Sequence, residues 1–216
     1  MLNLEKNFLK KRILIYGLGK SGLSTYAFLK KSNVISLFDD RIIVKKKTKD
    51  TNATYKEIIK KEFDCIIISP GIDINKCKLS RFLKKNHKKI YTDLDIFYCR
   101  YAFNKKITIT GTNGKSTTAK LLYDILNDQK KDVRLVGNIG NPILLEKKIK
   151  KDTLFVIEAS SYQLEYSKLF KTNISIILNI TPDHLERHKT LNKYVSAKFK
   201  LIKNQSKNDI AILNTK

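Results

Sequence analysis

The chain has 216 residues, of which 42% are hydrophobic and 30% charged, and this composition excludes a low-complexity or compositionally disordered polymer. Its apolar runs, such as residues 65–68 and 176–178, are far shorter than the roughly 20 residues that cross a bilayer, and no leader-like segment follows Met1, so we expect a cytoplasmic protein without a membrane partner. The net charge of +24 comes mostly from lysine doublets without interleaved aromatics or arginine forks, which argues against a nucleic-acid partner.

Short β-branched runs alternate with helical patterns along the chain, which is typical of parallel βαβ units. The predicted strands are residues 12–16, 34–38, 64–68, 90–92, 107–110, 133–136, 154–157, 174–178 and 210–213. Apolar residues at three- and four-residue spacing predict helices over 20–31, 94–100, 115–131 and 191–204. The predicted fold class is α/β.

A glycine-rich turn, G-L-G-K-S-G at residues 17–22, leaves the first predicted strand and begins a helix. Its G-x-G-x-x-G spacing lets the backbone turn tightly and directs N–H groups at a helix N-terminus toward a diphosphate. Asp39 and Asp40 end the next strand, where a carboxylate can accept hydrogen bonds from a sugar or base. The pattern favours a diphosphate site, and leaves open a nicotinamide dinucleotide as ligand or a turn that serves packing alone.

A second turn, T-G-T-N-G-K-S-T at residues 110–117, follows another apolar strand. It departs from the usual phosphate loop because Ile109 stands where the first glycine of G-x-x-x-x-G-K-[ST] belongs, but Gly114, Lys115 and Ser116 are intact. This sequence places a lysine beside the β- and γ-phosphates and a hydroxyl on Mg²⁺. It therefore predicts ATP and Mg²⁺ as cofactors.

The two turns together predict two nucleotide-type domains. Residues 1–103 are expected to form a Rossmann-like domain, and residues 104–216 an incomplete P-loop-type α/β ATPase domain. The expected junction is the stretch 101–105, between a helix and the strand that enters the second turn.

Polar side chains follow two later strands. Glu158 ends strand 154–157 and is a predicted Mg²⁺ ligand, the alternative being a solvated acid. His184 follows strand 174–178 and suits a second divalent ion, whereas His87 and His188 are expected to be structural or exposed. Lys198 lies four residues after Tyr194 on a predicted helix, and taken alone it is an ordinary lysine.

Three cysteines with neither C-x-x-C spacing nor an even number predict reduced thiols rather than a zinc site.

Taken in this order, the segments resemble the Mur ligases of peptidoglycan synthesis, with the G-T-N-G-K loop shared by folylpolyglutamate synthetases. Residues 136–142, 158–165 and 179–184 are similar to the D-glutamate-adding member. The resemblance implies a ligase that uses ATP to activate the terminal carboxylate of UDP-N-acetylmuramoyl-L-alanine as an acyl phosphate, which the amine of D-glutamate then displaces. In that reaction the first glycine turn serves UDP rather than NAD.

The resemblance also implies roles for individual residues. Those expected on the ATP phosphates are Gly111, Thr112, Asn113, Gly114, Lys115, Ser116 and Thr117. Ser116 and Glu158 would hold the first Mg²⁺, while His184 and a carbamylated Lys198 would hold the second, so that Lys115, His184 and Lys198 are the expected catalytic residues. The UDP sugar is expected to contact Lys20, Ser21, Asp39, Asp40, Arg41 and Gly71, and the muramoyl-alanine arm Asn138, Ser160 and Gln163.

Family members continue for roughly as many residues again, and that part would carry the adenine contacts and the D-glutamate pocket. We therefore expect a fragment, half of a split enzyme or a decayed remnant, with ligation only when a complementary C-terminal polypeptide is present. The alternatives are another amide-forming ligase of this type, a non-catalytic nucleotide-binding remnant and an NAD-dependent dehydrogenase.

Overall fold

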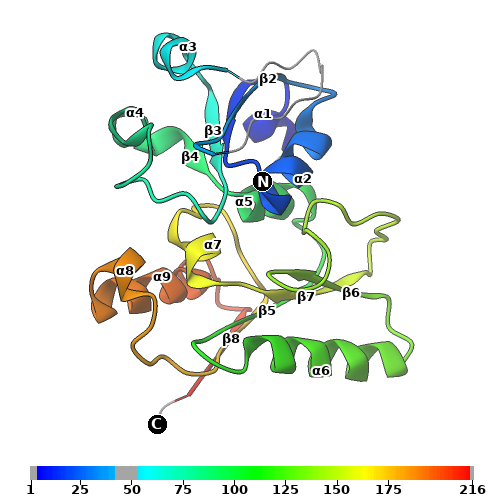
Figure 1. Ribbon diagram of the computed structural model, residues 1–216. Helices are drawn as coiled ribbons and strands as arrows, with labels where there is room; N and C mark the ends of the chain where they lie inside the picture. The colour runs from blue at the N-terminus through cyan, green and yellow to red at the C-terminus, as the bar shows by residue number, and fades with distance from the viewer. Residues whose placement is uncertain (1–3, 42–52, 215–216) are drawn as a thin grey trace. The chain divides into compact units, whose positions relative to one another are not determined.

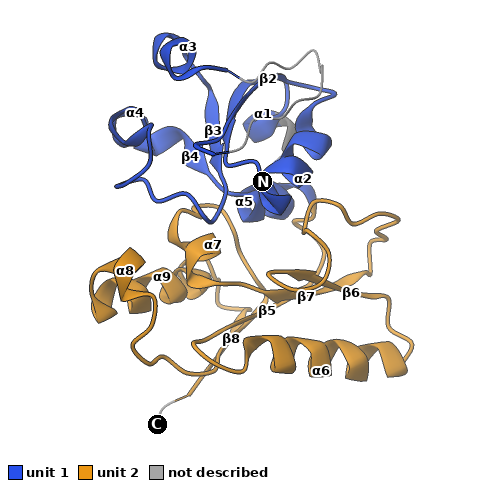
Figure 2. Ribbon diagram, in the orientation of Figure 1, with its two compact units in different colours: residues 1–100 blue, residues 101–216 orange. Residues whose placement is uncertain are grey.

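A computed structural model describes residues 4–41 and 53–214, which divide into two compact units, residues 1–100 and 101–216 (Figure 2). Each unit is built on one parallel β-sheet, as the α/β pattern predicts. The boundary expected between residues 103 and 104 lies just after this division. Within the described ranges, no helix combines the length and apolar character needed to cross a bilayer.

The first unit contains a four-stranded sheet of order β2-β1-β3-β4 (Figure 1). The central strand β1 pairs with β2 and β3, so Ile13, Leu14 and Ile15 are fully buried. Its strands are β1 (Arg12–Tyr16), β2 (Val34–Phe38), β3 (Cys65–Ile68) and β4 (Ile90–Tyr91). Its helices are α1 (Leu4–Phe8), α2 (Lys20–Leu29), α3 (Tyr55–Lys60), α4 (Ser80–Lys85) and α5 (Asp93–Arg100), with a 3₁₀ turn at His87–Lys89.

The second unit contains a five-stranded parallel sheet of order β6-β7-β5-β8-β9. Its strands are β5 (Lys106–Thr110), β6 (Val133–Gly137), β7 (Leu154–Glu158), β8 (Ile174–Ile177) and β9 (Ile210–Leu213). Its helices are α6 (Lys115–Asp128), α7 (Ser161–Glu165), α8 (Leu185–His188) and α9 (Leu191–Lys203). Helix α6 runs along the sheet in Figure 1, and its Ala119 is buried with Ile109, Val133 and Val156. Because all five strands are parallel, β5, β7 and β8 deliver their following residues to one edge of the sheet.

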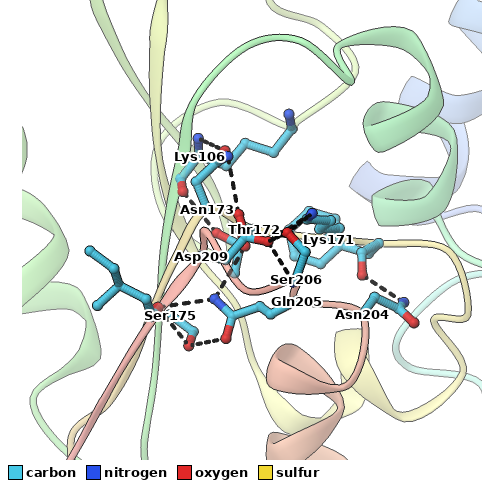
Figure 3. Close-up of polar contacts among 11 residues, drawn as sticks. Lys106, Lys171, Thr172, Asn173, Ser175, Asn204, Gln205, Ser206 and Asp209 are labelled. Atoms are coloured by element: carbon cyan, nitrogen blue, oxygen red, sulfur yellow. Dashed lines mark hydrogen bonds and ion pairs between the residues drawn. The ribbon is translucent and has the colours of Figure 1, made fainter. Parts of the chain in front are cut away.

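The opposite edge of this sheet is fastened by polar side chains around Lys106 (Figure 3). The Lys106 backbone N–H donates to Asn173 Oδ1 at 3.0 Å, and Thr172 Oγ1 donates to the Lys106 carbonyl at 2.9 Å. The buried Lys106 ammonium donates to the carbonyls of Tyr101 and Asn104, which begin the second unit. These contacts join the start of β5 to the turn before it and to the segment that enters β8.

The strand predictions agree with the structure to within one residue at each end. Helices were predicted slightly too long at their C-termini: the helix expected to reach residue 131 ends at Asp128, because the chain turns at Lys130, whose φ of 59° is left-handed. The helix expected over 20–31 ends at Leu29, and the one expected over 191–204 ends at Lys203.

Candidate functional site

All six residues predicted to hold a UDP sugar in the first unit line one cavity of about 580 Å³. It lies at the carboxyl ends of the strands, where the glycine turn enters α2. The lining residues are Gly17, Gly19, Lys20, Ser21, Asp39, Asp40, Arg41, Ser69, Pro70, Gly71, Ile72, Asp73, Lys76 and Cys77. The structure thus brings these residues together, and their contact with a ligand stays a prediction.

The shape of this cavity depends on the packing of the glycine turn. Gly17 has a left-handed φ of 95°, and its carbonyl accepts a hydrogen bond of 2.8 Å from Ser69 Oγ. A Cβ at Gly22 would lie 1.8 Å from the Gly17 carbonyl oxygen, so only glycine fits there. In the described structure no side chain caps α2 at Gly19, and the helix presents its first N–H groups to an anion.

The two carboxylates of the cavity also fasten its walls, which sequence reasoning did not anticipate. Asp39 accepts from the backbone N–H of Leu18 at 2.6 Å and of Arg41 at 2.8 Å. Asp40 accepts from the Tyr16 hydroxyl at 2.6 Å. Burial, then this hydrogen bond, raises the pKa of Tyr16, which keeps the phenol a donor. A carboxylate has about four acceptor positions, so a ligand hydroxyl can still bind.

Behind Ser21 lies a buried acid that no motif indicated. Ser21 Oγ donates to Asp93 Oδ2 at 2.5 Å, and Asp93 also accepts from the N–H of Leu94. Burial raises the pKa of Asp93, which is only 4% exposed. Because the Ser21 hydroxyl donates its hydrogen bond to Asp93, the Ser21 oxygen presents its lone pairs to a ligand and favours a donor there.

In the second unit, the phosphate loop is shaped by Asn179, which follows β8. Its Oδ1 accepts from the N–H groups of Thr112 at 3.1 Å and Asn113 at 2.9 Å, and its Nδ2 donates to the Asn113 carbonyl. Gly114 takes a left-handed φ of 81° and precedes α6, which no side chain caps in the described structure. The first N–H groups of a 14-residue helix therefore face the loop, as an anion site requires.

Glu158 is fully buried at the end of β7, so the solvated-acid alternative is wrong. Its Oε2 accepts from Ser116 Oγ and its Oε1 from Asn138 Nδ2, each at 2.8 Å. A hydroxyl and a carboxylate are ligands that Mg²⁺ prefers, and this pair fits the predicted ion. The part of the chain that the structure describes holds no cluster of three or more His, Cys, Asp or Glu that could bind a metal, so such an ion would take its remaining oxygens from phosphates and water.

The residues predicted along the muramoyl-alanine arm have structural partners as well. Ser160 and Gln163 form a capping box at the start of α7: the Gln163 N–H donates to Ser160 Oγ, and the Ser160 N–H donates to Gln163 Oε1 at 2.9 Å. Asn138 holds Glu158, as described above. All three lie beyond the carboxyl ends of β6 and β7, and their contact with substrate stays a prediction.

Lys198 lies on α9 in contact with the phosphate loop, and it is only 1% exposed. Its Nζ donates to the Gly111 carbonyl at 2.7 Å and lies 4.4 Å from the centre of the Tyr194 ring. Burial, with a further contribution from the charge of Lys115, lowers the pKa of Lys198 to about 8. This burial distinguishes Lys198 from the solvated lysines that dominate the sequence.

Tyr194 connects the remaining predicted residues and was missed as a functional residue. Its ring lies 6.3 Å from that of His184, and its hydroxyl lies 3.2 Å from Thr112 Oγ1 of the phosphate loop. His184 also packs on Tyr162, with ring centres 4.8 Å apart. The spacing of Tyr194 and Lys198, four residues apart on one helix face, was the available signal. The structure thus gathers the loop, Tyr194, His184 and Lys198 into one site.

Comparisons with known families agree with this geometry. Residues 109–216 match the Mur ligase middle domain, and residues 11–90 match the N-terminal domain described as Mur ligase, MurD-like. The chain belongs to the Mur ligase family. Both glycine turns fall inside the matched ranges, so the family accounts for both units.

Curated relatives agree with this membership. A UDP-N-acetylmuramoylalanine–D-glutamate ligase of Caldicellulosiruptor bescii is 40% identical over 220 residues, covering 94% of this chain and 47% of the relative. One with the same name from Rickettsia bellii is 35% identical over 210 residues, covering 95% of this chain and 46% of the relative. The chain spans about half the length of the curated relatives it matches.

Solved structures support the fold. The ligase that joins UDP-N-acetylmuramate to L-alanyl-gamma-D-glutamyl-meso-diaminopimelate, from Neisseria meningitides, superposes with a TM-score of 0.60 at 15% identity, covering 96% of this chain and 72% of that one. A UDP-N-acetylmuramate-alanine ligase from Thermotoga maritima gives a TM-score of 0.51 at 20% identity, covering 94% of this chain and 49% of that one. Both support a fold of two parallel-sheet α/β domains.

Proposed function

We propose that this chain provides the UDP-sugar and ATP-phosphate sites of a ligase that adds D-glutamate to UDP-N-acetylmuramoyl-L-alanine. The observation that carries the proposal is the set of relatives named for this reaction, which are 35% and 40% identical over 95% and 94% of the chain. Both glycine turns and the residues beyond each strand lie within the aligned length. A polypeptide corresponding to the rest of the relatives' length is required for the complete reaction.

The first unit binds the UDP portion of the substrate in the cavity beside α2. The uncapped N-terminus of α2 and the cations Lys20 and Arg41 attract the diphosphate. Ser21, whose proton is directed to Asp93, accepts a hydrogen bond from a ligand hydroxyl or N–H. These contacts suit a nucleoside diphosphate sugar, which combines an anionic centre with donor groups on both sides.

The second unit binds ATP through residues 111–117. The substrate carboxylate attacks the γ-phosphate, giving an acyl phosphate and ADP, and the amine of D-glutamate then displaces the phosphate through a tetrahedral intermediate. Lys115 and the N–H groups at the start of α6 present positive charge to the phosphates as negative charge accumulates. Magnesium, when bound beside Ser116 and Glu158, supplies further positive charge to the same oxygens.

Lys198 acts as a carbamate in this proposal. An ammonium is a cation that cannot bind Mg²⁺, whereas the neutral amine adds to the carbon of CO₂ and releases one proton, leaving an anion with two oxygens. The burial of Lys198 and the lowered pKa support the neutral amine as the reacting form. The carbamate and His184, each of which lies near the Tyr194 ring, would hold the second ion.

The test is reconstituted ligation. The full chain is mixed with a polypeptide covering the remaining length of a curated relative, and ADP release and UDP-N-acetylmuramoyl-alanyl-glutamate are measured, with Lys198→Ala as the inactive control. We expect product only when both polypeptides are present. Product with another amino acid but not with D-glutamate would indicate a different amide-forming ligase, and ATP binding without product from any amino acid would indicate a non-catalytic nucleotide-binding protein. Tighter calorimetric binding of NAD than of the UDP sugar would overturn the first-unit assignment.

A further inference from the structure

Helices α7 and α8 of the second unit are joined by side-chain bonds from three consecutive residues of α8. The Tyr162 hydroxyl donates to Glu186 Oε1 at 3.0 Å, and His188 Nε2 lies 3.0 Å from Ser161 Oγ. Two nitrogens of Arg187, Nε and a terminal one, donate to Glu165 Oε2 at 2.9 and 2.8 Å. We call the set of three contacts the α7–α8 ladder: Tyr162–Glu186, Glu165–Arg187 and Ser161–His188.

The central contact of the ladder is shielded from solvent. The Arg187 side chain is 8% exposed and that of Glu165 is 21% exposed, and the guanidinium lies 5.2 Å from the centre of the Tyr162 ring. A shielded arginine that binds a carboxylate through two nitrogens and stacks on an aromatic ring is held more firmly than an exposed ion pair. By contrast, the exposed pair Lys120–Asp124 on α6 contributes little to stability.

The ladder bears directly on the conformation of His184. His184 precedes α8 with a left-handed φ of 53°, a conformation that is unfavourable for a residue other than glycine. Its carbonyl accepts from the N–H groups of Arg187 at 3.1 Å and His188 at 3.0 Å. The position of α8 therefore determines the backbone of His184, and the ladder determines the position of α8.

We propose that Glu165 and Arg187 are positioning residues that hold His184 in this conformation, beside Tyr194. This inference rests on the proposed function for its purpose, which is to preform the second-cation site. Because α7 also carries the Ser160–Gln163 capping box, the ladder connects the predicted muramoyl-alanine arm to His184. Neither residue contacts the expected ion, and each acts through α8.

The chain has only three histidines, so isotope-labelled histidine gives an NMR spectrum in which each ring is followed separately. His184 lies over the Tyr162 ring and its resonance is shifted by that ring, whereas the exposed His87 in the first unit serves as the internal reference. Mn²⁺ accepts the same oxygen-rich ligands as Mg²⁺ and broadens nearby resonances. We expect Mn²⁺ to broaden His184 at lower concentrations than His87.

Glu165→Gln keeps the size of the side chain and removes its charge. We expect the His184 resonance to move toward that of an exposed histidine and the Mn²⁺ concentration for half-broadening to rise about tenfold. The matched control is Asp124→Asn, which breaks the exposed ion pair on α6 and should leave both readouts unchanged. A change confined to thermal stability, with both His184 readouts unaltered, would show a merely structural role and overturn the proposal.

Arg187→Lys keeps the charge but replaces the two-nitrogen contact with a single ammonium. If Glu165→Gln does not fold, this variant tests whether the ladder positions His184. An intermediate His184 shift supports positioning by the ladder, and an unchanged shift overturns it. The His184 shift requires neither ATP nor D-glutamate. If the chain shows the His184 shift but gives no ligation with the complementary polypeptide, the positioning role is supported and the proposed function is contradicted. Equal broadening of His87 and His184 in the unmodified chain would overturn the link to a cation site.

Discussion

The two units repeat one local design, a glycine turn between a strand and a helix with an acid at the end of a neighbouring strand, yet the acids are bound differently. In the first unit, Asp39 accepts from the backbone N–H groups of Leu18 and Arg41 and so fastens the walls of its own cavity. In the second unit, Glu158 accepts from the side chains of Ser116 and Asn138. A carboxylate bound by backbone stabilises a loop, whereas one bound by side chains can exchange those donors for a cation.

The glycines of the two turns also differ in the reason that each is required. Gly22 is required because the Gly17 carbonyl lies where a Cβ would be. Gly114 is required because its φ of 81° is left-handed, while the nearest atom to an added Cβ, Leu178 Cδ1, lies at an ordinary 3.5 Å. Gly22 is thus required by packing and Gly114 by backbone conformation.

The strongest test of the comparison exchanges each acid for its amide. We expect Glu158→Gln to lower the reconstituted ligation rate by about 10²–10³-fold, because the amide can still accept from Asn138 Nδ2 and donate to Ser116 Oγ but offers no charge to a cation. Its thermal stability should be retained, since a fully buried carboxylate is costly to fold. Ligation assays and thermal unfolding of the same protein measure the two effects.

Asp39→Asn should behave in the opposite way. The amide has a single acceptor oxygen and can keep only one of the bonds from the Leu18 and Arg41 N–H groups, so we expect the first unit to lose about 1–2 kcal/mol of stability and to bind the UDP sugar less tightly. Nucleotide binding by the second unit should not change, which calorimetry with ATP and Mg²⁺ checks. If both variants lost ATP binding equally, the distinction between the two acids would be wrong.

A further pair of variants tests whether packing or flexibility governs the first turn. Gly22→Ala places a Cβ against backbone and should destabilise the first unit by about 3 kcal/mol. Gly19→Ala is the matched control, because among the described residues nothing lies within 4 Å of its added Cβ. Hydrogen exchange over β1 should accelerate in the first variant only. Equal protection in both variants would mean that the turn moves to accommodate the methyl group.

Much of this arrangement could be predicted from the sequence. Short β-branched apolar runs located every strand of the described residues, and the resemblance to the Mur ligases indicated six residues that lie together in the lining of the first cavity. The parallel strands allowed the site of the second unit to be predicted as well, because residues that follow different parallel strands meet at one edge of the sheet. This is why Glu158 and the phosphate loop could be expected together.

Other features could not be predicted, for reasons that are physical. Lys106, Thr108 and Thr110 alternate with isoleucine, a pattern typical of a strand with one wet face, but the central position of β5 buries them all. Asp93 contacts Ser21, a partner 72 residues away in the sequence, so no local spacing identified it. The ladder depends on how two short helices pack, which pattern alone does not determine.

The smallest predicted effect is the change of stability with pH that buried ionisable groups cause. This change has opposite signs in the two units. Burial lowers the pKa of Lys106 from 10.5 to about 7 and that of Lys198 to about 8, whereas burial raises the pKa of Asp93 in the first unit. Between pH 7 and 10.5 the unfolded chain holds the Lys106 proton and the folded chain does not. The stability of the second unit should therefore rise with pH across that window, while Asp93 makes the first unit less stable as pH rises above the ordinary aspartate pKa.

Lys106→Met removes one of the two buried bases of the second unit, and it tests whether the stability of that unit rises with pH. We expect the unfolding free energy of the unmodified chain to rise between pH 7 and 9 by on the order of 1–2 kcal/mol more than that of the variant, the slope that remains coming from Lys198. The neighbouring Lys105 is exposed, so Lys105→Met should keep the full slope. Urea unfolding at several pH values, with hydrogen exchange followed separately over β1 and β5, gives the slope for each unit. Identical slopes for Lys106→Met and Lys105→Met would show that the Lys106 ammonium, held by the carbonyls of Tyr101 and Asn104, keeps its proton throughout this range.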